Sequence, residues 1–320
     1  MRILIASPIF PATIEELQEE HDVVCAFDAK REELKDLIRD REILTFRSGV
    51  SITADVMACS PDLKLLIRAG SGIDNLDEDF VHGRGIQLVR IPEPGAKAVA
   101  EMSFALMLAL ARNLLQADRL LRQGKWAKHE LTGYLLTGKT LGIVGVGNIG
   151  SRVGRLGAAW GMEVIGYDKV VSPAMVADLK EKGIRLSTFD EVLYRSDFLS
   201  IHVPLCESTR YLFNAETLAG MKRGAFLINL ARGGVVDERA LCHELREGGR
   251  LRGAALDVHE EEGDGKMSPL AKLPNVILTP HIGAGTIDSQ REIGKRIMQI
   301  IASFSLKQEL IRSQARIQAA

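Results

Sequence analysis

Cysteine is scarce in this sequence, and its few residues lie far apart. The four of them, Cys25, Cys59, Cys206 and Cys242, form no C-x-x-C pair and have no histidine at metal-ligand spacing beside them. A disulfide framework and a cysteine-based zinc site both need regularly spaced sulfur atoms, so neither is expected. We interpret the four as small core or surface residues of a protein from a reducing compartment.

The sequence also lacks a long apolar run and an excess of charge of one sign. Its longest apolar segment, 102–111, is far shorter than the ~20 residues that span a bilayer. The apolar start, Met1–Ala6, is too short for a signal peptide, and glutamates follow almost at once. A net charge of −1 leaves no basic field for phosphate backbones. We therefore predict a cytoplasmic protein without a nucleic-acid or membrane partner.

Apolar segments of strand length alternate with charged helical segments in the first part of the chain. This rhythm predicts a parallel sheet with helices on both faces. Two prolines and a glycine interrupt it at Val89–Gly95, which predicts a domain crossing. The helical pattern that follows, 98–123, has apolar residues on more than one face and therefore predicts a homodimer. The strand candidates are Ile3–Ala6, Val23–Ala26, Ile43–Phe46 and Leu65–Ile67.

A glycine-rich turn is the most informative motif. Gly145, Gly147 and Gly150 form G-x-G-x-x-G between an apolar run, Thr140–Val144, and a helix-compatible segment, Gly150–Trp160. The first glycine permits the tight turn, the second lets the backbone approach a pyrophosphate, and the third lets the helix pack closely on the strand. The motif in this context predicts a dinucleotide-binding Rossmann unit.

An acidic residue follows the motif at the expected distance. Asp168 ends the apolar segment Met162–Asp168, where a carboxylate can accept hydrogen bonds from both hydroxyls of the adenosine ribose. The same charge would repel a 2′-phosphate. The sequence therefore predicts NAD rather than NADP.

Four later strand candidates, 198–203, 226–229, 253–257 and 276–279, complete a doubly wound sheet. The last helical stretch, 289–308, is expected to return to the first domain. The predicted fold is α/β, with two doubly wound parallel-sheet domains and a Rossmann NAD-binding domain inserted in a flavodoxin-like substrate domain. The predicted boundaries are 1–97 and 286–320 for the substrate domain and 98–285 for the NAD domain.

Three polar residues follow strand candidates of the second domain, at the edge where open α/β sheets bind ligands. Arg232 can fork onto a carboxylate, and His281 can exchange a proton near neutral pH. Glu262 lies five residues beyond Asp257 and can hold the imidazole. Each alone can be a surface charge or a structural residue. Together with an NAD motif they supply an anion anchor, an acid and its orienting group, as reduction of a 2-oxo acid requires.

Two further segments have alternative interpretations. His202 ends a strand and either packs as a structural residue or contacts the cofactor loop. In the second case Val203 and Pro204 line the site of the adenine or the ribose. The glycine-rich turn Arg68–Asn75 either cradles a carboxylate through the N–H groups of Ser71 and Gly72, or is a plain strand-to-helix turn.

Along nearly its whole length the chain resembles the D-isomer-specific 2-hydroxyacid dehydrogenases. The resemblance implies that Arg232 binds the substrate carboxylate and carbonyl, that His281 is the acid/base paired with Glu262, and that Ser71 and Gly72 hold the substrate carboxylate. The matching segments are 68–75, 98–101, 138–150, 202–205 with Thr209, 229–234, 255–258 and 279–284. The predicted contacts to NAD are Gly145, Gly147, Asn148, Ile149, Gly150, Asp168, Val203, Pro204, Thr209, Ala231, Asp257 and Gly283.

Within the family the chain looks most like the 3-phosphoglycerate dehydrogenases, through 46–48, 50–54 and 68–77. That resemblance implies that Arg47 and Arg68 lie near the charged groups of the substrate. The sequence departs from the pattern at Gly95, where asparagine is usual, at Gly263–Gly265, where proline is common after the glutamate, and in having no C-terminal regulatory domain. Hydroxypyruvate or glyoxylate reduction, D-lactate oxidation, and a non-catalytic NAD-sensing, corepressor-like role are the alternatives.

Overall fold

Five short strands form the parallel sheet of the first of two units. They lie in the order β2-β1-β3-β4-β5, which is the flavodoxin-like order. Because helices cover both faces, the three middle strands are buried almost throughout. The strands are β1 (Arg2–Ile5), β2 (Asp22–Cys25), β3 (Ile43–Phe46), β4 (Leu65–Arg68) and β5 (Gln87–Arg90).

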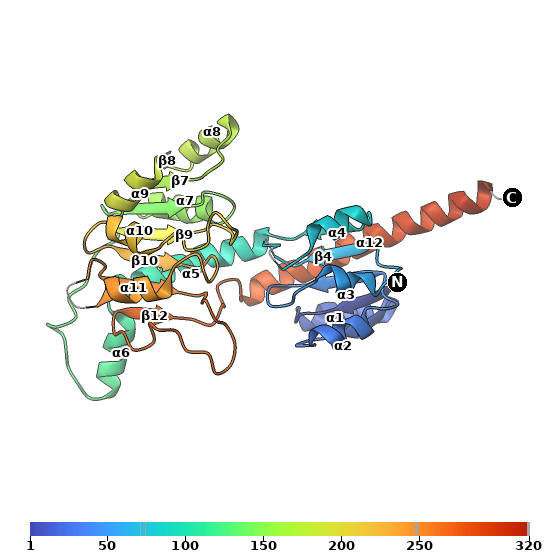
Figure 1. The fold of residues 1–320 in the computed structure, drawn as a ribbon, viewed down its shortest axis with the longest axis horizontal. Coiled ribbons are helices and arrows are strands. Elements are labelled where there is room, and N and C mark those ends of the chain that lie inside the picture. Colours follow the sequence, from blue (N-terminus) through green and yellow to red (C-terminus); the bar gives the residue numbers. More distant parts are fainter. Residues whose placement is uncertain (71, 74, 247–248, 319–320) are drawn as a thin grey trace. The chain divides into compact units, whose positions relative to one another are not determined.

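The helices of this unit come from both ends of the chain. α1 (Pro11–Glu20), α2 (Arg31–Leu37), α3 (Ala54–Ala58) and α4 (Glu78–Gly83) follow the strands, and α12 (Ile287–Gln318) returns from the C-terminal side, red in Figure 1. One face of α12 buries Ile293, Ile297 and Ile301 against the sheet, in one cluster with Ile3, Ile43 and Leu65. This apolar spacing of three and four residues explains why the helix packs there.

The computed structural model describes residues 1–70, 72–73, 75–246 and 249–318. Its two units are Met1–Gly95 with Gly285–Ala320, and Ala96–Ala284. The boundaries expected from the sequence differ from these by two residues at the first crossing and one at the second.

Seven parallel strands form the sheet of the second unit, in the order β12-β11-β10-β9-β6-β7-β8. The order reverses between β9 and β6, so this is a Rossmann-type sheet with a switch point beside the glycine-rich turn. The strands are β6 (Thr140–Val144), β7 (Glu163–Tyr167), β8 (Ile184–Leu186), β9 (Phe198–Ile201), β10 (Phe226–Asn229), β11 (Gly253–Leu256) and β12 (Val276–Leu278).

Seven helices accompany this sheet in the described residues. They are α5 (Glu93–Ala111), α6 (Leu114–Arg122), α7 (Gly150–Ala159), α8 (Pro173–Glu181), α9 (Phe189–Arg195), α10 (Ala215–Gly220) and α11 (Glu238–Leu245). α5 is long and apolar enough to cross a membrane by those criteria alone, but 72% of its most apolar stretch is buried in the structure. Its Phe104, Met107 and Leu110 belong to the core on one face of the sheet, so it is a core helix.

Two sequence expectations about elements differ from the structure. The single helix over 98–123 is two helices, because Asn113 adopts a left-handed conformation with φ 53° between them. β5 and β8 were not predicted, since both are short edge strands with few buried residues. Of the apolar residues in this helical segment, Phe104, Leu106, Met107 and Leu110 are buried, whereas Leu114 is 51% exposed.

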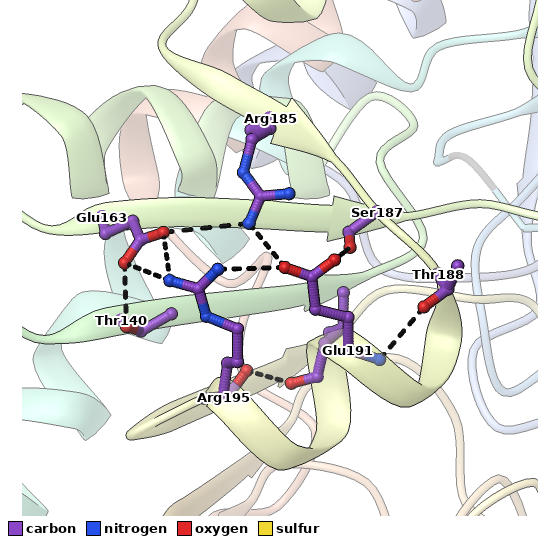
Figure 2. A network of polar contacts seen from close by, with 9 residues as sticks. Thr140, Glu163, Arg185, Ser187, Thr188, Glu191 and Arg195 are labelled. Carbon is purple, nitrogen blue, oxygen red and sulfur yellow. Dashed lines mark hydrogen bonds and ion pairs between the residues drawn. The ribbon is translucent and has the colours of Figure 1, made fainter.

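An ion-pair network fastens α9 to β7 and β8 (Figure 2). Glu191 accepts hydrogen bonds from Arg185 and Arg195, at 2.8 and 2.9 Å, and from Ser187. Arg195 also pairs with Glu163 on β7 at 2.7 Å. The bonds from Arg185, Ser187 and Arg195 lower the pKa of Glu191 to about 2. A single exposed ion pair contributes little to the stability of a protein. Here several pairs together connect α9 with β7 and β8 at the edge of the sheet, and β7 leads to Asp168.

Candidate active site

The glycine-rich turn after β6 has the geometry of a phosphate cradle. Gly145 has φ +94°, and a Cβ there would lie 2.5 Å from the carbonyl oxygen of His202, so both the turn and the close packing require glycine. A Cβ on Gly150 would lie 2.0 Å from the carbonyl oxygen of Gly145, whereas the space around Gly147 is open. These are the three roles that a dinucleotide motif assigns to its glycines.

Three backbone N–H groups of this turn are unsatisfied in the described structure. Within the described residues, no protein group accepts the backbone N–H of Gly147, Asn148 or Ile149. α7 begins at Gly150, so these N–H groups sit at the positive end of a helix dipole, which suits a pyrophosphate. The residues present therefore fit a dinucleotide.

Asp168 lies directly after β7, beside the turn. Its Oδ2 accepts the N–H of Val146 at 3.0 Å, and its Oδ1 accepts the N–H of Val170 at 3.4 Å. The half-buried carboxylate is thus fixed in orientation and keeps lone pairs for ribose hydroxyls.

Three neighbouring strands deliver the three polar residues singled out in the sequence. Arg232 follows β10, Glu262 follows β11 and His281 follows β12, and these strands are adjacent in the sheet. Because the strands are parallel, all three segments leave from the same edge, which we call the carboxyl edge.

His281 and Glu262 form a hydrogen-bonded pair at this edge. Nδ1 of His281 lies 3.0 Å from Oε2 of Glu262, and both side chains are partly exposed. Partial burial favours the protonated carboxyl, but the hydrogen bond and charge of His281 outweigh it and hold the pKa of Glu262 below its ordinary value. The bond at Nδ1 leaves Nε2 directed elsewhere, without a hydrogen-bond partner among the residues that the structure describes. This ring can exchange a proton through Nε2.

The two neighbouring glutamates are engaged differently. Glu260 accepts the N–H of Glu238 at 2.9 Å, and Glu261 pairs with Lys266 at 3.0 Å. Among the three consecutive glutamates, only Glu262 contacts the imidazole in the described structure.

Asp257 holds the loop that carries His281. Its buried carboxylate accepts the N–H groups of Ile282 and Gly283, at 2.9 and 2.7 Å, and the hydroxyl of Thr279. His281 itself has φ 53°, a conformation that few residues other than glycine adopt, and its N–H donates to the carbonyl oxygen of Asp257 at 2.8 Å. Asp257 and Gly283, expected from the resemblance to contact NAD, thus fix the His281 backbone.

Asn229, which the sequence pattern does not single out, shapes the turn before Arg232. Its buried side chain accepts the N–H of Ala231 at 3.0 Å and donates to the carbonyl oxygen of Arg232 at 3.1 Å. The guanidinium of Arg232 donates to the carbonyl oxygen of Ala231 at 2.8 Å. The signal in the sequence is a buried amide at the last position of a strand.

His202 lies beside the glycine-rich turn, with its carbonyl oxygen packed against Gly145. Its Nε2 contacts the hydroxyl of Ser200 at 2.8 Å, and burial lowers the pKa of His202 to about 3. The ring is therefore neutral and unsuited to donate a proton near neutral pH. In the loop that follows, Thr209 donates to the carbonyl oxygen of Pro204 at 2.6 Å, while Val203 is half-buried.

The remaining predicted residues lie in the first unit. Arg47 is half-buried and burial lowers its pKa, whereas Arg68 is buried over the ring of Phe46, 5.6 Å from its centroid. Asn75, also without a predicted role, donates to the carbonyl oxygens of Arg47 and Val50. Gly72 is half-buried in an irregular segment, and Ser71 lies outside the described residues.

Comparison with known proteins identifies the family. Residues 104–283, within the second unit, match the model described as D-isomer specific 2-hydroxyacid dehydrogenase, NAD binding domain. The chain belongs to this family. It is 41% identical over 302 residues to D-3-phosphoglycerate dehydrogenase of Methanocaldococcus jannaschii. The aligned region covers 94% of this chain and 57% of that protein. The hydroxypyruvate reductase of Thermotoga maritima is 41% identical over 274 residues, covering 85% of this chain and 87% of that protein.

The solved structures agree with this assignment. The D-lactate dehydrogenase of Aquifex aeolicus, complexed with NAD and lactic acid, superposes with a TM-score of 0.84 and 31% identity, over 97% of this chain and 96% of that one. The chain spans about half the length of the D-3-phosphoglycerate dehydrogenases that it matches. The roles of the individual residues described above stay predictions.

Proposed function

We propose that this protein transfers a hydride between NAD and a D-2-hydroxy acid/2-oxo acid pair. The observation that carries the proposal is the pair formed by His281 and Glu262, at the carboxyl edge of an NAD-binding sheet. A proton donor with a fixed carboxylate, beside a dinucleotide cradle, is the arrangement that carbonyl reduction needs.

NAD, when bound, would accept or supply the hydride at its nicotinamide ring. In reduction, Nε2 of His281 donates a proton to the substrate oxygen; in oxidation it takes that proton from the hydroxyl. Glu262 stabilises the imidazolium through Nδ1. Arg232 binds the substrate carboxylate and stabilises charge on the reacting oxygen. The glycine-rich turn and Asp168 hold the pyrophosphate and the ribose.

For the substrate we favour the pair 3-phosphoglycerate and 3-phosphohydroxypyruvate. Arg47 supports this choice, because its half-buried guanidinium has no carboxylate partner among the described residues and thus suits a phosphate. Arg68, Ser71 and Gly72 are proposed to bind the remaining anionic groups. The Methanocaldococcus relative carries the matching name.

Hydroxypyruvate reduction is the second candidate. The relative from Thermotoga maritima favours it, because its 41% identity equals that of the Methanocaldococcus relative. Hydroxypyruvate lacks the phosphate, so Arg47 would then have no anionic group to bind.

NADH oxidation with a panel of 2-oxo acids tests these proposals. The panel contains 3-phosphohydroxypyruvate, hydroxypyruvate, glyoxylate and pyruvate, each assayed with the unmodified protein and with Arg47→Ala. We expect Arg47→Ala to lower kcat/KM for the phosphorylated substrate about tenfold or more, and to change the others little. Equal losses for all four would exclude a phosphate contact at Arg47. NADH binding without turnover of any of them would favour the NAD-sensing role.

We also propose a homodimer, formed through α6 and the segment after it. No residue of α6 is buried, and Leu115 and Leu121 are 56% and 59% exposed, with Trp126 at 80%. Such apolar exposure suits a partner surface. Sedimentation that detects only monomer at micromolar concentration would contradict this. Location in the cytoplasm, and the lack of nucleic-acid and membrane partners, stay predictions.

A further inference from the structure

A hollow lined by arginines lies at the amino edge of the second sheet, where its strands begin. Its volume is about 680 Å³, and four arginines line it: Arg223, Arg246, Arg250 and Arg252. The carboxyl edge, with Arg232, Glu262 and His281, lies at the other ends of the same strands. The hollow is therefore separate from the candidate active site.

Hydrogen bonds hold the segments that carry these arginines together. Arg223 precedes β10, Arg246 follows α11, and Arg250 and Arg252 precede β11, the strand paired with β10. The N–H of Gly224 donates to the carbonyl oxygen of Arg250 at 2.8 Å, and the N–H of Arg252 donates to that of Ala225 at 2.9 Å.

The side chain of Asn275 closes the frame from a third segment, just before β12. It donates to the carbonyl oxygens of Leu245 and Arg252, at 2.9 and 3.0 Å. Hydrogen bonds thus connect the three segments at residues 224–225, 245, 250, 252 and 275, so this part of the backbone is ordered before binding.

No carboxylate forms an ion pair with any of the four guanidiniums, as far as the described part of the chain extends. Arg250 donates Nε to the carbonyl oxygen of Met221, and Arg252 lies 4.6 Å from the centroid of the Tyr134 ring. Arg223 and Arg246 have exposed side chains and no side-chain partner among these residues.

Two described carboxylates, Glu244 and Asp197, belong to segments next to those of the hollow. Glu244 accepts the backbone N–H of Arg250 at 3.1 Å and contacts His243. Asp197 pairs with Lys222 at 2.7 Å. The four arginines of the hollow therefore outnumber the described carboxylates of these segments, which leaves a net positive charge there.

We propose that this hollow binds an anion with two or more phosphoryl groups. Guanidinium groups form forked, charge-assisted hydrogen bonds to phosphate oxygens, and several of them match the charge of a diphosphate better than that of a monoanion. The volume is within the range of small-molecule sites, so it can accept a free diphosphate or the diphosphate of a nucleotide.

Calorimetric titration with inorganic pyrophosphate tests the proposal. It compares the unmodified protein with R223Q/R246Q, chosen because neither side chain makes a hydrogen bond or an ion pair within the described residues. Arg155→Gln is the matched control, since Arg155 is an exposed arginine on α7 of the same unit, outside the hollow. We expect the double variant to weaken pyrophosphate binding at least tenfold, and Arg155→Gln to change it less than twofold. Equal binding by the unmodified protein and the double variant, or none by either, would overturn the proposal.

Three further measurements keep the result unambiguous. The titrations are run with and without saturating NADH, because pyrophosphate can also bind at the glycine-rich turn. Only the pyrophosphate binding that is lost in R223Q/R246Q is assigned to the hollow. ADP in place of pyrophosphate separates the sources: tighter binding of ADP indicates a nucleotide, and equal binding indicates the diphosphate alone. A thermal unfolding midpoint of R223Q/R246Q equal to that of the unmodified protein shows that the variant folds. Since the readout is binding of pyrophosphate, it can succeed or fail independently of the proposed dehydrogenase activity.

Discussion

The two edges of the second sheet differ in how their charged side chains are compensated. At the carboxyl edge, Glu262 contacts His281, and Asp257 accepts three hydrogen bonds from the loop that carries His281. At the amino edge, Arg223 and Arg246 have no such partner among the described residues. At the carboxyl edge, partners within the protein fix the geometry and the protonation state of the imidazole that the reaction needs. At the amino edge, the guanidinium groups are available to a ligand.

The largest effect is expected at His281. We predict that His281→Asn lowers kcat by about 10² to 10⁴, the range typical of losing a general acid/base. Asparagine tolerates the left-handed backbone at this position, so the loop should persist. Steady-state kinetics and an NADH titration check this, with His243→Asn, an exposed histidine on α11, as control. Activity retained in His281→Asn would remove the acid/base role.

A smaller effect is expected when the supporting carboxylate is removed. Asp257→Ala leaves three donors of the His281 loop without an acceptor, which should cost about 3 kcal/mol of stability and lower kcat about 10²-fold by misplacing the imidazole. Asp197→Ala is the matched control at the amino edge, where the carboxylate accepts from Lys222 and the N–H of Thr140. Chemical denaturation and kinetics together separate an effect on stability from an effect on catalysis. Asp197→Ala should lower the stability but leave kcat unchanged. Equal losses of kcat in both would mean that Asp257 acts only through general stability.

Asp168 should have a still smaller effect, confined to the cofactor. Asp168→Ala removes the acceptor proposed for the ribose hydroxyls, so the KM for NADH should rise about tenfold and the preference over NADPH should shrink. Asp178→Ala, on the exposed face of α8, is the control. An unchanged ratio of kcat/KM for NADH and NADPH would show that Asp168 does not select the cofactor.

Much of the carboxyl edge was predictable because strand ends are visible in the sequence. Arg232 and His281 each follow an apolar run, and Gly145 to Gly150 lie between a run and a helix, so topology alone brings them to one edge. The choice of Glu262 among three glutamates was predicted from spacing, and the contact to His281 is formed by that residue in the structure.

The other features of the fold and the site were not predictable from the sequence, because they depend on contacts between segments that lie far apart in it. The bonds of Asn229 and Asn275 join residues that a local pattern does not relate, and β8 carries only one buried residue. The arginines of the hollow are spread over loops whose charges look like ordinary surface residues. Only the pairing of β10 with β11 brings their segments together.

The pH dependence of reduction in Glu262→Gln tests the central claim most directly. Because the pKa of Glu262 lies below its ordinary value, this carboxylate is charged at every pH above that range, and its charge is lost only as the pH falls through the lowered value. Near neutral pH it therefore always stabilises the imidazolium form of His281. The substitution removes that stabilisation, so the alkaline limb of kcat/KM for NADH-dependent reduction should move to lower pH, with activity lost first at alkaline pH. Glu261→Gln, whose carboxylate pairs with Lys266, should leave the profile in place. A profile unmoved in Glu262→Gln, or displaced equally in Glu261→Gln, would contradict the assignment of the proton to the His281–Glu262 pair.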